Sequence, residues 1–376
     1  MIIIDGSVGE GGGQILRTAL TLSLITQKPF QLTKIRYNRP KPGLQPAHLM
    51  AVQAAAKIAS IDERKAKLGA TELEFFPQSV QRGKYHFRIN TAGSTSLVLQ
   101  TIYLPLLLNS PKDSKQTQIP EKQGNEREPH LGDFEANELT SSEIVIEGGT
   151  HVPFSPVFDY LATTWNSYLM RMGISIDLAL ERYGFYPRGN GKIKAIIPPV
   201  SKILPIWDHH DSEQAKVVYS AKLTALHNHR SKSDVKKTVE SCQHDLHQLR
   251  IRSSLDMVEI EDGPVLVLML ELRRVDVERS TPILFSKIAD KNKPLNILPA
   301  ALIKEVHAFV NSGAAVDEHS ADQIILPLMF ASGPSRFFVS KISQHLLTNI
   351  EIIGKFIDRR IQVQGELDQQ GEIQIE

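Results

Sequence analysis

Residues that could carry out phosphate chemistry lie near the start of the chain. The stretch "DGSVGEGGGQILRTAL" (residues 5–20) places Glu10 among glycines and Arg17 just inside the amphipathic run that follows. Glycines let backbone N–H groups approach an anion closely, and a helix N-terminus favours negative charge. Glu10 would repel a phosphate unless a divalent cation lay between them. The pattern predicts a phosphate and metal site, and a tight turn with a solvated glutamate is the alternative.

The glycine loop fits neither of the two common nucleotide-binding motifs. A P-loop needs G-x-x-x-x-G-K-[ST], and residues 6–13 supply no such lysine. The dinucleotide motif G-x-G-x-x-G begins at Gly9 and Gly11, but Gln14 occupies its last glycine position. Both standard nucleotide-binding folds are therefore disfavoured.

A candidate nucleophile lies near the other end of the chain. In "SQHLLTNIEII" (residues 343–353), His345 stands where a helix should begin, and the apolar residues after it recur at helical spacing. A helix N-terminus disfavours imidazolium and leaves a ring nitrogen able to attack phosphorus. From the residues alone, a polar capping role for His345 is the alternative.

The elements that must position these residues alternate between strand and helix. The patterns predict a strand at 2–4, helices from residue 14 and over 47–59, and a strand at 84–90. A small, polar turn before an apolar helix then recurs. Its copies are "NTAGSTSLVLQTIYLPLLL", "IEGGTHVPFSPVFDYLATTWNSYLM" and "DEHSADQIILPLMFASG". This repetition predicts a fold of related α/β modules.

Two segments interrupt the modules. Residues 110–142 are polar, contain proline and have few large apolar residues, which predicts an exposed insertion. Residues 184–282 contain several strands and one helix, which predicts a small inserted α/β domain. The larger domain would then comprise residues 1–183 and 283–376.

Composition limits the class of protein. Lys and Arg total 43 and Asp and Glu total 42, so the net charge predicts no partner, and any nucleic-acid contact must come from a local patch. Cys242 is alone, which excludes an intrachain disulfide and favours a reducing compartment. No apolar run reaches the length of a membrane span. We expect a cytoplasmic protein without a membrane partner.

These motifs together resemble the RNA 3'-terminal phosphate cyclase family. The resemblance extends in order over nearly the whole chain, through "DGSVGEGGGQILRTAL", "IRYNRPKPGL", "TAGSTSLVLQT", "GGT", "GFYPRGNG", "ADQIILPL" and "HLLTNI". It implies an α/β (α+β) fold in which a large domain of repeated units, like those of enolpyruvyl transferases, carries a smaller inserted α/β domain. It also implies ATP-dependent, ligase-type conversion of an RNA 3'-phosphate to a 2',3'-cyclic phosphate through a histidine–AMP intermediate, with release of AMP and pyrophosphate. The implied partners are ATP, a divalent metal ion (Mg or Mn) and RNA with a 3'-phosphate; no obligate protein partner is evident.

The resemblance also implies roles for individual residues. The nucleophile would be His345, and the metal ligand Glu10. The residues implied for ATP are Gln14, Arg17, Gln100, Pro156, His319, Asp322 and Gln323. The residues implied for phosphates of the substrate are Arg36, Arg39 and His48. A planar arginine fork suits phosphate, with a solvated strand end as the alternative for the two arginines and a helix-start cap as the alternative for His48.

The chain departs from the family pattern in a few places. His319 stands where the family has a tyrosine against the adenine, which leaves less stacking area. Val152 replaces a common asparagine, and the 110–142 insertion is unusual. The rival hypothesis is a non-catalytic RNA-binding or ribosome-assembly factor on the same fold. Such relatives lack the histidine motif, so His345 favours the enzyme. An enolpyruvyl transferase would rest on fold analogy alone.

Overall fold

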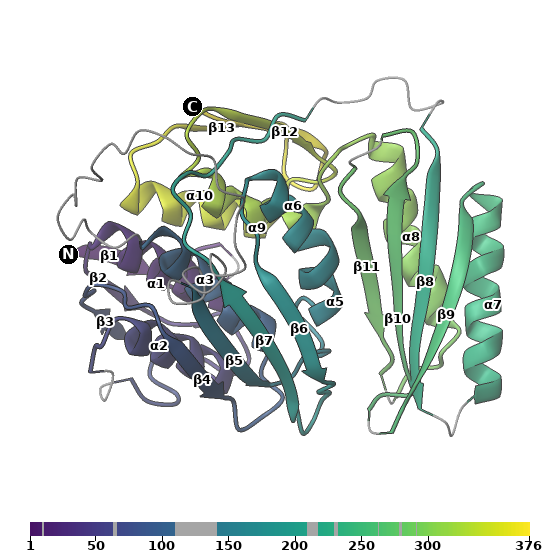
Figure 1. Ribbon diagram of the computed structural model, residues 1–376, viewed down its shortest axis with the longest axis horizontal. Coiled ribbons are helices and arrows are strands. Elements are labelled where there is room, and N and C mark those ends of the chain that lie inside the picture. Colours follow the sequence, from purple (N-terminus) through teal and green to yellow (C-terminus); the bar gives the residue numbers. More distant parts are fainter. Residues whose placement is uncertain are drawn as a thin grey trace, which may run out of the picture.

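The computed structural model describes residues 1–9, 11–62, 66–109, 141–208, 217–228, 232–261, 263–277, 280–290 and 292–376 (Figure 1). Glu10 and almost all of the predicted 110–142 insertion lie outside these ranges. The last two residues of that insertion are described, and Ser142 already begins a strand.

The first unit carries the glycine loop. Strands β1 and β2 pair in parallel, and β3 closes the sheet β1-β2-β3 in the antiparallel sense. Helix α1 follows the glycines as the sequence predicts, and most of its residues are buried on every side rather than along one face. The bounds are β1 Ile2–Asp5, α1 Gly13–Thr26, β2 Phe30–Thr33, α2 Pro46–Ile58 and β3 Leu73–Phe75.

The second unit repeats this plan with one more strand. Its sheet has the order β4-β5-β7-β6, with β4 and β5 parallel. Buried and half-buried residues alternate along β5 and β7, so one face of the sheet packs inward. The long predicted helix contains a π-helical turn, η1. The bounds are β4 Lys84–Arg88, α3 Thr95–Leu108, β5 Ser142–Gly148, α5 Phe158–Tyr160, η1 Leu161–Trp165, α6 Asn166–Arg171, β6 Asp177–Arg182 and β7 Gly191–Ile197.

The C-terminal unit carries the candidate nucleophile. Its sheet has the order β12-β14-β13; Trp207 forms an isolated parallel bridge to Arg336 of β12, and Ile203 forms one to Ala331 before that strand. Helices α9 and α10 each begin after a short extended segment that leads toward the site. The bounds are α9 Glu318–Leu328, β12 Ser335–Val339, α10 Gln344–Phe356, β13 Ile361–Gln364 and β14 Gly371–Ile375.

A fourth sheet stands apart from these three units on the right of Figure 1. It has the order β11-β10-β8-β9, and helices α7 and α8 pack against it and against each other. The bounds are β8 Tyr219–Asn228, α7 Lys232–Gln248, β9 Arg252–Ile260, β10 Leu266–Arg274, β11 Ile283–Ile288 and α8 Ile297–Ser312.

Strand pairing corrects the predicted 184–282 insertion at both ends. Strand β7, which the sequence interpretation put inside the insertion, pairs with β5 and β6 of the large sheet. Strand β11, which it put outside, pairs with β10. The reason is physical: alternation of buried and exposed residues identifies a strand but does not say which strand will be its neighbour.

The helices of the three repeated units meet in the middle of the molecule. In Figure 1, α1, α3, α9 and α10 lie between the three sheets. Helix α1 packs against α10, α3 and α2, and nine consecutive or nearly consecutive residues of α1 are buried. This arrangement brings the start of α1 against the start of α10, although they lie at opposite ends of the chain.

Candidate active site

His345 is the second residue of α10, and its ring faces Gln14 of α1. Ser343 caps the helix by accepting a hydrogen bond from the backbone N–H of Leu346. His345 Nδ1 lies 2.6 Å from Gln14 Oε1. The side-chain amide of Gln14 donates in turn to Asp322 Oδ2 at 3.2 Å. Three helices, α10, α1 and α9, therefore contribute one side chain each to a single hydrogen-bonded chain.

The donor and acceptor order of these hydrogen bonds sets the tautomer of His345. Gln14 Nε2 is the donor to Asp322 Oδ2, so the amide presents its oxygen to the histidine. An amide oxygen only accepts, so His345 Nδ1 carries the proton. In the neutral ring Nε2 then has a lone pair, which is the requirement for a nitrogen nucleophile.

Buried polar contacts lock the same three helices together. Thr18 Oγ1 donates to Asn349 Oδ1 at 2.7 Å, one turn along α1 and α10 from the pair just described. The amide of Asn349 donates to the backbone oxygen of Asp322 at 2.7 Å. Thr18 and Asn349 are both buried, so losing the side chain of either would leave the other with an unsatisfied polar group. These contacts fix the position of the nucleophile relative to α1.

Asp322 and Arg17 lie near each other in a poorly solvated place, and each affects the pKa of the other. Burial raises the pKa of Asp322 to about 7, against the opposing effects of His319, Gln14 and Arg17. Burial likewise lowers the pKa of Arg17 to about 10, which the carboxylate of Asp322 partly offsets. Asp322 Oδ1 is buried and has no hydrogen-bond partner among the described residues. An acceptor of this kind suits a ligand hydroxyl or N–H group.

The glycine loop lies directly against His48. A methyl group added at Gly13 would come within 2.1 Å of His48 Nε2, so only glycine fits there. His48 Nδ1 accepts from the backbone N–H of Gln45 as part of a capping box, so Nε2 carries the proton. Burial, together with Arg17 and Arg36, lowers the pKa of His48 to about 3. The helix-start cap and the position near the phosphate loop are therefore both found at this residue.

Two arginines complete the positive charge around the loop. Arg36 and Arg39 lie in a turn rather than at a strand end, and Arg36 has a left-handed backbone (φ 56°). Arg36 Nε is buried without a hydrogen-bond acceptor among the described residues. Burial and the nearby charge of Arg39 lower the pKa of Arg36. A guanidinium that is short of acceptors and repelled by its neighbour suits an anionic ligand.

The N-terminus of α1 is also open to an anion. Within the described residues no side chain caps α1, and its first turn contains no acid. Its N-terminal N–H groups therefore need another partner. Gly9 and Gly11 both have positive φ (59° and 55°), which bends the loop around this end of the helix. The loop, the helix end and the arginines together make a site that fits a polyphosphate.

The residues implied for the nucleoside lie on the neighbouring helices. Gln100 of α3 donates from Nε2 to Gln323 Oε1 of α9. Pro156 is half-buried in the loop before α5, and the ring of His319 is 64% exposed in the first turn of α9. The hydroxyls of Tyr160 and Ser320, 2.9 Å apart, join these two elements. Gln100, Gln323, Tyr160 and Ser320 thus join α3, α5 and α9 at one junction.

The predicted metal ligand cannot be placed, because Glu10 lies outside the described residues. Within the described ranges, no group of three or more His, Cys, Asp or Glu side chains could hold a metal ion. A metal site at the glycine loop therefore stays a prediction from the sequence.

Sequence reasoning missed two kinds of supporting residue. Asn349 was part of a quoted motif but received no role, although a buried asparagine on the apolar face of a helix is itself a signal. It also missed His151, which is fully buried between the Thr150 hydroxyl (2.9 Å) and the Asp159 carboxylate (2.7 Å). These contacts hold the loop that contains Pro156.

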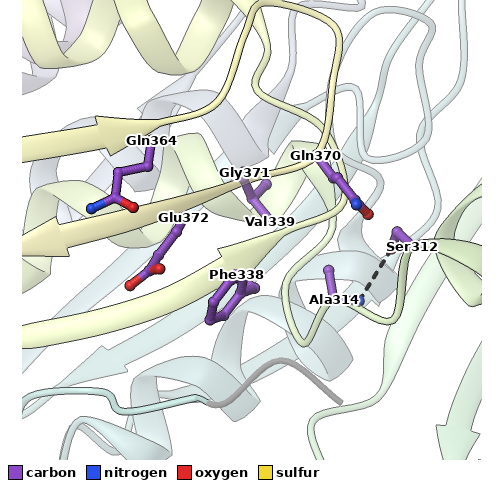
Figure 2. A pocket seen from close by; sticks show the side chains of 8 residues that line it. All are labelled: Ser312, Ala314, Phe338, Val339, Gln364, Gln370, Gly371 and Glu372. Atoms are coloured by element: carbon purple, nitrogen blue, oxygen red, sulfur yellow. Dashed lines mark hydrogen bonds between the residues drawn. The ribbon is translucent and has the colours of Figure 1, made fainter. Parts of the chain in front are cut away.

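A separate hollow lies on the C-terminal sheet. Its volume is about 350 Å³, and Figure 2 shows its walls from β12, β13, β14 and the end of α8. Its carboxylate, Glu372, is already bound by Arg336. None of the predicted site residues lines it, and its one hydroxyl, that of Ser312, donates to the backbone oxygen of Phe309. The lining residues are Ser312, Ala314, Phe338, Val339, Gln364, Gln370, Gly371 and Glu372.

Comparison with known proteins gives a consistent result. A family model described as "RNA 3'-terminal phosphate cyclase" matches residues 8–119 and 133–363. Curated proteins of that name from Koribacter versatilis, Ralstonia nicotianae and Caldivirga maquilingensis are 38%, 35% and 34% identical to this chain. The alignments cover 97%, 98% and 96% of this chain and 92%, 94% and 94% of those proteins. Among the helices in the described ranges, none is long and apolar enough to span a membrane.

Proposed function

The chain belongs to the RNA 3'-terminal phosphate cyclase family, and we propose that it uses ATP to convert an RNA 3'-phosphate into a 2',3'-cyclic phosphate through adenylylated His345. The single observation that carries the proposal is the 2.6 Å contact between His345 Nδ1 and Gln14 Oε1. It assigns the proton to Nδ1, so Nε2 is the ring nitrogen that would attack phosphorus.

The first step forms one bond and breaks another at the α-phosphorus of ATP. His345 Nε2 attacks, the bond to the bridging oxygen breaks, and pyrophosphate leaves. The imidazole becomes cationic as it reacts, and the amide oxygen of Gln14 stabilises the Nδ1–H. Arg17, Arg36 and the N-terminus of α1 would bind the phosphate oxygens as negative charge moves onto the leaving group.

The second stage gives the RNA phosphate a leaving group. A terminal phosphate oxygen is a poor leaving group, so the 2'-hydroxyl cannot cyclise onto it directly. An oxygen of the RNA phosphate therefore attacks the histidine-bound AMP and regenerates neutral His345. The 2'-hydroxyl then attacks the activated phosphorus, loses its proton and displaces AMP. Arg39 and the Nε2–H of His48 are the side chains beside the glycine loop suited to the RNA phosphate.

We also propose a divalent cation beside Glu10, and this part of the proposal rests on the sequence pattern. When bound, such an ion would neutralise phosphate charge beside Glu10 and allow an acid inside a phosphate loop. The support is the sequence pattern, because the described residues contain no metal cluster.

The test is covalent labelling. The protein is incubated with α-labelled ATP and a divalent metal ion, and label on the protein is tested for the acid lability of a histidine phosphoramidate. We expect label on the parent and on the control His307→Asn, which changes an exposed histidine of α8. We expect none on His345→Asn. Label retained by His345→Asn would refute the assignment, and no label on any protein would favour the non-catalytic RNA-binding alternative.

A further inference from the structure

Four loops near the candidate site form one continuous surface with a local excess of positive charge. With the adjoining ends of α2, β4 and β6, they comprise residues 36–47, 88–94, 149–156 and 182–190, and we call them the four-loop surface. They contain six Lys or Arg and no Asp or Glu, whereas the whole chain has a net charge of only +1. The cations are Arg36, Arg39, Lys41, Arg88, Arg182 and Arg188.

Close backbone contacts join the four loops to one another. A methyl group added at Gly93 would lie 3.0 Å from the Ala47 side chain, and one at Gly189 would lie 2.6 Å from the backbone oxygen of Thr91. The backbone N–H of His151 donates to Gly184 O at 3.0 Å. Ala47 precedes His48, which touches the glycine loop, so the surface starts at the candidate site and leads away from it.

Three aromatic side chains project from this surface. Phe154 is 105% exposed, Tyr186 is 71% exposed and Tyr37 is 64% exposed, which are the largest values for any Phe, Tyr or Trp among the described residues. Phe154 also has a left-handed backbone (φ 62°), which is costly for an aromatic residue. The buried contacts of His151 with Thr150 and Asp159 hold this loop in place. The exposure of Phe154 is thus part of an ordered loop.

The basic groups retain charge that a ligand can use. Arg88 and Arg182 lie 2.8 Å and 3.8 Å from the same carboxylate, Glu147, which is only 14% exposed. One negative charge therefore faces two guanidinium groups. Cations interleaved with projecting aromatic rings match a single nucleic-acid strand, whose phosphates bind arginine and whose bases stack on aromatic faces.

We propose that the four-loop surface binds the single-stranded segment of RNA that precedes the reacting 3' end, with Phe154 and Tyr186 as stacking platforms for its bases. This inference rests on the proposed function, because it takes RNA as the substrate. It goes further by naming where the strand runs and by requiring an unpaired strand, since a base inside a duplex offers no face for stacking.

The experiment measures RNA binding without turnover. A 5'-fluorescent, unstructured RNA of about twelve nucleotides with a 3'-phosphate is titrated by anisotropy, because about four or more nucleotides span a typical stacking site. Phe154→Asn removes the ring and keeps a residue that tolerates a left-handed backbone. Tyr186→Ala removes the second ring. Phe76→Ala is the matched control, because Phe76 is 56% exposed and lies outside the four-loop surface.

We expect each of the first two variants to raise Kd at least about fivefold, and the control to leave it unchanged. Arg188→Gln should lower the slope of log K against log salt by about 0.7, as one phosphate contact on a single strand is lost, while Lys304→Gln on α8 should not. Covalent labelling with ATP alone should be unaffected in all three loop variants and both control variants, which separates RNA binding from the first chemical step.

Equal Kd values for Phe154→Asn, Tyr186→Ala and the parent would overturn the proposal while leaving the cyclase function intact. Loss of covalent labelling by the parent would instead refute the proposed function, and anisotropy would still report on the surface because it needs no turnover. Equal weakening of an RNA duplex and of the single strand by the two variants would also overturn it, since stacking requires unpaired bases.

Discussion

Replacing Gln14 by methionine tests whether this residue positions the nucleophile. Gln14 accepts from His345 Nδ1 at 2.6 Å and donates to Asp322 at 3.2 Å. Methionine has a similar volume and flexibility but can make neither contact, so the packing of α1 should survive. The histidine would then lose the acceptor that fixes its tautomer and stabilises its positive charge during attack.

The magnitude follows from the charge that develops on the ring. A hydrogen bond to a charged group contributes about 2 kcal/mol, which is more than one between neutral groups. The imidazole is neutral before attack and cationic afterwards, so most of this loss falls on the transition state rather than on ATP binding. At about 1.4 kcal/mol per factor of ten, the rate of adenylylation should fall roughly thirtyfold.

The assay is single-turnover labelling with α-labelled ATP over a range of ATP concentrations. Gln14→Met should lower the maximal rate with little change in the ATP concentration at half-maximal rate. Gln100→Met is the matched control, because Gln100 contacts Gln323 and not His345; it should weaken ATP binding and preserve the maximal rate. If Gln14→Met instead labels at the parental maximal rate and only binds ATP more weakly, Gln14 acts on the triphosphate alone and the tautomer argument fails.

Three further changes probe other parts of the site. Burial raises the pKa of Asp322 from 3.8 to about 7, so between these values the folded protein holds a proton that the unfolded chain has released, and stability falls as pH rises. Asp322→Asn lacks this dependence, so its free energy of unfolding relative to the parent should increase between about pH 5 and pH 8 in urea titrations; a constant difference would contradict the buried carboxylate. Glu10→Ala should impair metal-dependent adenylylation, and an unchanged metal titration would make Glu10 a simple turn residue. His319→Tyr should preserve ATP binding or tighten it by up to roughly fivefold through a larger stacking face, and His319→Ala should weaken it. Calorimetry with a non-hydrolysable ATP analogue decides, and unweakened binding by His319→Ala would remove residue 319 from the base site.

Periodic segments of the fold could be predicted from the sequence, and strand partners could not. Helix α1 was expected from residue 14 and begins at Gly13, and the helix expected over 47–59 spans Pro46–Ile58. Local spacing alone determines such elements. Strand β7 was recognised as a strand but assigned to the wrong sheet; it pairs both with β6, the strand directly before it, and with the distant β5. Its alternating residues identify a strand but not whether it pairs backward with β6 or forward into the inserted domain.

In the site, too, local structure could be predicted from the sequence, whereas contacts between distant residues could not. The start of a helix at His345 follows from local sequence, and the structure has it at α10. The contact between His345 and Gln14 joins residues 331 positions apart, and that between Gln14 and Asp322 joins residues 308 apart. Motif resemblance suggested that Gln14 faces the triphosphate, but only the folded chain shows its contact with the histidine.

The packing of α1 against α10 has a consequence for synthesis of the protein on the ribosome. Helix α1 is made well before the helix that covers it, because Thr18 of α1 contacts Asn349 of α10, which is 331 positions later in the chain. Lys28, just after α1, donates a hydrogen bond to the backbone oxygen of Phe356, which is also made late in synthesis. A nascent chain must therefore keep the apolar face of α1 from aggregating until its C-terminal partner arrives. Shortened chains that end before residue 344 would lack both His345 and this cover, so truncation removes the proposed nucleophile and the packing partner of α1 together.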